Sequence, residues 1–188
     1  MKASTKFCLI GLLVAGLEEF ITQGVLKKTS AGWILPTIIA FLPFLIIVRL
    51  LGKFLNWSLD EPAAVLIYYL AAGSIGLLVE WFLIGLTPWG DPNAPFVVVL
   101  VLQLGMFSFW GSVAFAPRIL LDDRDSISQI RRSYKQFLIF GLAVIYCLTF
   151  AASKEAQFLV SILAVLITFL VLNFFYFRYV RALGKLGI

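Results

Sequence analysis

The sequence predicts an all-α membrane protein, a bundle of six transmembrane helices with both chain termini in the cytoplasm. The first observation behind this prediction is composition: 62% of the 188 residues are hydrophobic and only 13% are charged. Soluble domains carry about 25% charged residues, so this chain lacks the polar groups that would cover a soluble globule. The second observation is that the apolar residues fall into runs of about 20, the length of a helix that crosses the hydrocarbon core.

Six segments are apolar and long enough to be spans, because a helix satisfies its own backbone hydrogen bonds where no water is available. The first is interrupted by two glutamates, and the fifth is the shortest. No repeat or long linker divides the chain, and we expect residues 1–188 to form one transmembrane domain. The predicted spans are 7–26, 32–51, 62–86, 95–120, 137–152 and 156–180.

The beginning of the first span resembles a signal peptide, since Lys2 and Lys6 precede an apolar run and small residues. A second apolar stretch, residues 20–26, completes a helix of membrane length. We therefore expect the segment to be retained as a span.

The distribution of Lys and Arg predicts the orientation, because basic residues favour the cytoplasmic side. Of the 15 basic residues, only Lys27, Lys28 and Lys154 lie in the loops opposite the termini. We therefore expect a multi-pass protein of the plasma (inner) membrane. This asymmetry also explains the net charge of +5, so the charge gives no support for binding to nucleic acid.

The longest polar stretch, residues 118–135, places Ile127, Ile130 and Tyr134 on one helical face, with basic residues beside them. We expect either a short helix lying on the inner leaflet or a solvated connector. In the first case its basic side chains are available to lipid phosphates, which makes membrane lipid a predicted partner.

Three glutamates lie inside predicted spans, where a charge costs several kcal/mol. Two glutamines lie at a comparable depth, and two tryptophans are candidate walls of a cavity beside them. The predicted ligand-binding residues are Glu18, Glu19, Gln23, Glu80, Trp81, Gln103 and Trp110.

Small residues lie at helical spacing on the same faces as these glutamates. Small side chains let membrane helices approach closely, so these stripes should face the interior of the bundle. We expect the first, third and fourth spans to converge around the glutamates, with either Glu18 or Glu19 facing the interior. The stripes comprise Gly11, Ala15, Glu18 and Thr22, or Gly16, Glu19 and Gln23, in the first span and Ala72, Gly73, Gly76 and Glu80 in the third.

No Lys or Arg lies at the predicted depth of the glutamates. An unpaired carboxylate in a low dielectric takes up a proton or recruits a cation. The site should therefore be protonated, loaded with a metal or sodium ion, or occupied by a small cationic ligand. In the structural alternative, a protonated Glu18 or Glu19 only binds Gln103 and holds the helices together.

Three functions remain open from the sequence. The first is a protein that binds or transports a small solute, ion or proton through a carboxylate-lined intramembrane pocket. The second is an intramembrane enzyme that uses a protonated glutamate as general acid on a lipid or isoprenoid. The third is an accessory subunit of a membrane complex or an oligomer. Since the chain has no histidine, histidine triads, haem ligation by histidine and histidine-containing metal sites are excluded.

Residues 18–26 resemble the first box of the CAAX-protease and bacteriocin-processing family of intramembrane proteins. That box consists of two glutamates, three further residues and an arginine. In this chain Gln23 replaces the arginine, and the histidines of the family's other two boxes are missing. The resemblance therefore implies no protease activity here.

Overall fold

The computed structural model describes residues 3–19, 34–85, 87 and 95–184, and these residues form helices and their connections without a strand. The predicted all-α class is confirmed. η3 and η4 are single π-helical turns that continue the helices before them. The elements are α1 (Ala3–Glu19), α2 (Ile34–Ser58), α3 (Glu61–Val79), η3 (Glu80–Ile84), α4 (Phe96–Leu120), α5 (Asp125–Gln136), η4 (Phe137–Gly141), α6 (Leu142–Ala151) and α7 (Lys154–Gly184).

Four helices in the described ranges are long and apolar enough to cross a membrane. They are Thr37–Ser58, Glu61–Ile84, Phe96–Leu120 and Lys154–Gly184, which match the second, third, fourth and sixth predicted spans. The architecture is therefore that of an all-helical membrane protein.

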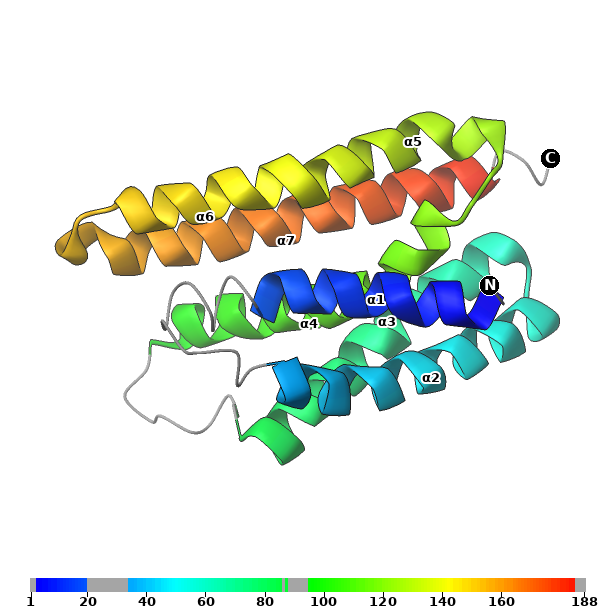
Figure 1. Ribbon diagram of the computed structural model, residues 1–188, viewed down its shortest axis with the longest axis horizontal. Helices are drawn as coiled ribbons and strands as arrows, with labels where there is room; N and C mark the ends of the chain where they lie inside the picture. The colour runs from blue at the N-terminus through cyan, green and yellow to red at the C-terminus, as the bar shows by residue number, and fades with distance from the viewer. Residues whose placement is uncertain (1–2, 20–33, 86, 88–94, 185–188) are drawn as a thin grey trace.

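The other two predicted spans differ from these four. α1 is a shorter apolar helix, because the part of the first predicted span that the structure describes ends at Glu19. The fifth predicted span, residues 137–152, forms η4 and α6, which continue α5 as one helical rod (Figure 1). The total of six spans stays a prediction.

α3 and α4 form the centre of the bundle. α1 and α2 pack on one side of this pair, and α5 and α7 pack on the other (Figure 1). Each side has an apolar core: Phe41 and Trp110 lie in the first, and Phe115 and Tyr176 lie in the second. Many large apolar side chains outside the two cores are exposed, as contact with lipid requires, including Leu13, Phe54, Leu83, Phe96 and Phe177.

The small-residue stripe of α3 faces α4, as predicted. Ala72, Gly73 and Gly76 are all buried. A Cβ atom added at Gly73 would lie 2.6 Å from the ring of Phe107, and one added at Gly76 would lie 2.0 Å from Cγ of Trp110. The two helices can therefore approach this closely only because side chains are missing from α3.

The apolar face of α5 corrects one expectation. Ile127, Ile130 and Tyr134 do not lie on a leaflet: they are buried in the core that α3, α4 and α7 share with α5. α5 runs along α7 (Figure 1), so protein covers the stripe that was expected to contact lipid.

One end of the bundle gathers most of the described basic residues. α2 continues to Ser58, beyond the predicted end of the second span at residue 51, and includes both Arg49 and Lys53. Nε of Arg49 donates to Oγ of Ser4 at 3.1 Å, which joins the end of α2 to the start of α1. We call this the basic end. The side of the membrane that it faces stays a prediction.

Candidate functional site

Glu80 is the first residue of the π-helical turn η3, at the end of α3 that lies far from the basic end. Only 8% of its surface is exposed. The helix ends at Gly85, whose φ of 84° is left-handed and whose N–H donates to the carbonyl oxygen of Glu80.

Trp110 of α4 holds the carboxyl group of Glu80. Its indole Nε1–H donates to Oε1 of Glu80 at 2.9 Å. The ring stacks on Phe41, with centroids 4.4 Å apart, and meets Phe44 edge-on at 4.7 Å. Because Trp110 is completely buried, it offers no ring face to a ligand. In this structure Trp110 positions the carboxyl group of Glu80, and its predicted part in ligand binding stays a prediction.

A second bond of the same kind joins η3 to α4. The Nε1–H of Trp81 donates to Oε1 of Gln103 at 2.7 Å. Gln103 and Trp110 lie seven residues apart, which places them on one face of α4. Two successive residues of η3 thus bind the same face of the neighbouring helix through indole N–H bonds.

Glu19 ends the described part of α1 and is half-buried. It lies within electrostatic range of Glu80. α1 and α3 both pack against α4, as the convergence of the first, third and fourth spans predicted. Glu18 lies in α1, but its side chain is outside what the structure describes, and Gln23 lies outside the described residues altogether.

The described ion pairs lie at the basic end, where Arg124 and Arg131 form them, so none of them involves Glu80. Nor do the described residues contain a group of three or more acidic or cysteine side chains that could hold a metal ion. Chemically, Glu80 with Glu19 nearby suits a proton or a small cation, because a buried carboxylate needs a positive charge to balance it. Ligand binding by these residues stays a prediction.

A polar network at the basic end was not predicted from the sequence. Nη1 of Arg124 lies 2.6 Å from Oε2 of Glu61, and its Nη2 binds Asp122. The hydroxyl of Tyr179 donates to Oδ2 of Asp122 at 2.7 Å. The only signal in the sequence was the mixture of acids and bases around Arg124, because Glu61 and Tyr179 lie 63 and 55 positions away from it.

Asp122 is nearly buried in this network, with a side chain that is 6% exposed. Burial raises the pKa of Asp122, but the hydrogen bonds from Arg124 and Tyr179 outweigh it and hold the pKa below its ordinary value of 3.8. The same hydrogen bond to Asp122, together with the one to Glu61, raises the pKa of Arg124. Both groups therefore stay charged at neutral pH and tie α3 to α7.

The chain matches no protein-family model, no curated protein and no solved structure.

Proposed function

We propose that this chain is a small integral membrane protein that binds or transports a small solute, ion or proton, and that a proton or small cation binds at Glu80. The observation that carries the proposal is the 2.9 Å hydrogen bond from Trp110 to a carboxyl group that is only 8% exposed. That carboxyl group sits in a helix apolar enough to span a membrane.

The physical argument concerns charge balance. A bare carboxylate in an apolar medium is too costly to persist, so it binds a proton or a cation. Glu19 lies within electrostatic range, and two neighbouring carboxylates titrate as a coupled pair. No basic side chain in the described ranges forms an ion pair with Glu80. The function that these contacts support best is the binding of one proton or small cation that Glu80 and Glu19 share.

We further propose six spans and a plasma membrane location, with both termini and the basic end in the cytoplasm. This orientation is supported by the gathering of basic residues at one end, because basic residues favour the cytoplasmic side. In it, Glu80 and Glu19 lie toward the outer leaflet. A proton or cation would then reach the site from the outside first.

Proton flux into vesicles tests this function. Purified protein is reconstituted into liposomes with a trapped pH-sensitive dye, and a potassium diffusion potential drives uptake. We expect Glu80→Gln to reduce the flux to that of empty vesicles, since the amide cannot carry a proton. The matched control is Glu155→Gln, because Glu155 is an exposed glutamate in the first turn of α7. Equal flux in wild type and Glu80→Gln, with either protons or sodium as the driven ion, would overturn the proposal.

A further inference from the structure

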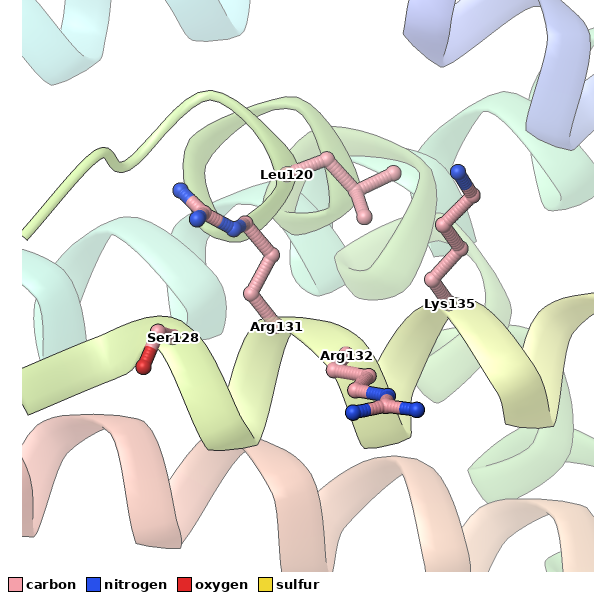
Figure 2. Close-up of a pocket in the computed structure, with 5 residues that line it drawn as sticks. All are labelled: Leu120, Ser128, Arg131, Arg132 and Lys135. Atoms are coloured by element: carbon pink, nitrogen blue, oxygen red, sulfur yellow. The ribbon is translucent and has the colours of Figure 1, made fainter. Parts of the chain in front are cut away.

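A pocket of about 550 Å³ opens at the basic end, far from Glu80. It is lined by Leu120, the last residue of α4, and by Ser128, Arg131, Arg132 and Lys135 of α5. In Figure 2, Arg131 and Lys135 extend from α5 on either side of Leu120, whereas Arg132 leaves the same helix between them and points away from Leu120. Arg131 and Lys135 thus flank Leu120, and Arg132 completes the lining of the pocket.

The fold fixes where these side chains point. Ser128, Arg131, Arg132 and Lys135 lie three, four and seven residues apart, which places them on one face of α5. The neighbouring face carries Ile127, Ile130 and Tyr134, which are buried against the rest of the bundle. Burial of that face sets the rotation of α5 and holds the basic face beside the end of α4.

Two of the three cations have no acidic partner in the described part of the chain, namely Arg132 and Lys135. Arg131 is partly engaged: its Nη1 binds the carbonyl oxygen of Asp122 and lies 3.2 Å from Oδ1 of Asp123. The hydroxyl of Ser128 already donates to the carbonyl oxygen of Asp125 at 2.6 Å. The pocket therefore offers positive charge from Arg132 and Lys135 that nothing in the described chain neutralises.

The position of the pocket relative to the membrane indicates the kind of ligand that it binds. Leu120 ends the candidate span Phe96–Leu120, so the pocket lies where the hydrocarbon gives way to lipid headgroups. Guanidinium groups bind phosphate oxygens through paired hydrogen bonds, and lysine adds a point charge. Basic pockets of membrane proteins at this level suit anionic headgroups. We propose that the pocket binds the phosphate group of an anionic membrane lipid, with Leu120 against the first part of its acyl chain.

This inference is independent of the Glu80 site and is tested by lipid retention. Full-length protein in detergent is mixed with phosphatidylglycerol or phosphatidylcholine, and the retained lipid is counted by native mass spectrometry. The double variant R132Q/K135Q should bind phosphatidylglycerol about tenfold more weakly, which corresponds to about 1.4 kcal/mol. The charge-matched control K53Q/R181Q removes two exposed basic residues outside the pocket and should bind as wild type does.

Three outcomes would overturn the inference. Retention of phosphatidylglycerol by R132Q/K135Q at the wild-type level would show that the pocket does not hold the lipid. An equal loss in K53Q/R181Q would show a general effect of charge. Displacement of the lipid by inorganic phosphate at equal concentration would assign the pocket to a soluble phosphate instead. Both side chains replaced in the double variant are exposed, so a wild-type unfolding temperature is expected and serves as the folding control.

Discussion

The indole nitrogen of Trp110 lies 2.9 Å from Oε1 of Glu80, and the same indole ring lies almost parallel to Phe41, with 20° between the ring planes. Trp110 of α4 thus contacts α2 through its ring and the carboxyl group in η3 through its N–H. We therefore expect a displacement of the carboxyl group to disturb the packing of Trp110 on Phe41 and Phe44. We therefore expect the stability of the fold and the charge on Glu80 to be coupled through Glu80 and Trp110.

Replacement of Trp110 by Phe tests this coupling. The substitution keeps a ring against Phe41 and removes the N–H donor, so a buried acceptor loses its partner at a cost of about 1–3 kcal/mol in the free energy of unfolding. In the background of Glu80→Leu no carboxyl group is left without a donor, and the same substitution should cost less. Chemical denaturation in detergent gives all four values of the double-mutant cycle. Additive effects, with a coupling energy below about 0.5 kcal/mol, would contradict the account.

The close approach of α3 and α4 predicts a strong effect at Gly76. A Cβ atom there would lie 2.0 Å from Cγ and 2.1 Å from Cβ of Trp110, atoms that cannot swing away. Gly76→Ala should therefore destabilise the protein by about 1–3 kcal/mol, the usual cost of overpacking. Gly16→Ala is the matched control, since no heavy atom lies within 4 Å of its added Cβ. The measurement is the denaturation midpoint, and equal midpoints for the two variants would refute the packing argument.

The network at the basic end predicts a pH dependence. Because the pKa of Asp122 in the folded protein lies below its ordinary value of 3.8, the ionised carboxylate stabilises the fold above roughly pH 4. This contribution is lost as the pH falls through the lowered pKa. Asp122→Asn should cost about 1–3 kcal/mol at neutral pH, since it disrupts a nearly buried set of bonds to a charged group, and should flatten the acid limb of the stability curve.

Asp123→Asn serves as the control for Asp122. The Asp123 side chain is 99% exposed and meets Arg131 at 3.2 Å, and exposed pairs contribute about 0–1 kcal/mol. Its stability curve between roughly pH 3 and pH 7 should therefore follow that of the wild type. If Asp122→Asn followed the wild-type curve as well, the network would have no part in acid sensitivity.

The proposed orientation predicts which end of the bundle reagents can reach. In a C8A/C147A background, Ser126→Cys places an exposed thiol at the start of α5, and Ser153→Cys places one before α7 at the opposite end. A membrane-impermeant maleimide applied to intact cells should label Ser153→Cys and should label Ser126→Cys only after permeabilisation. The reverse pattern would show that the basic end lies outside.

Much of the fold could be predicted from hydropathy, because spans are defined by length and composition. The α3 stripe was also predictable, since Gly73 and Gly76 precede Glu80 at helical spacing and small residues mark helix contacts. The burial of the α5 apolar face was not predictable: Ile127 and Tyr134 form the same amphipathic pattern whether lipid or protein covers them.

At the candidate site, residue types could be predicted better than their roles. Glu80, Trp81, Gln103 and Trp110 were chosen because polar and amphipathic groups are costly or distinctive inside a membrane. Their pairing depends on the π turn at Glu80 and on Phe41, which stacks on Trp110. Neither feature has a sequence signal, since Phe41 is one apolar residue among many in α2.

Infrared difference spectroscopy of the reconstituted protein tests the central claim most directly, because a protonated carboxylic acid has a carbonyl band of its own. The account predicts a carbonyl band that responds to a pH jump or to added sodium in the wild type and in Glu155→Gln, and that is missing in Glu80→Gln. An unchanged difference spectrum in Glu80→Gln would contradict the claim that Glu80 binds the proton or the cation.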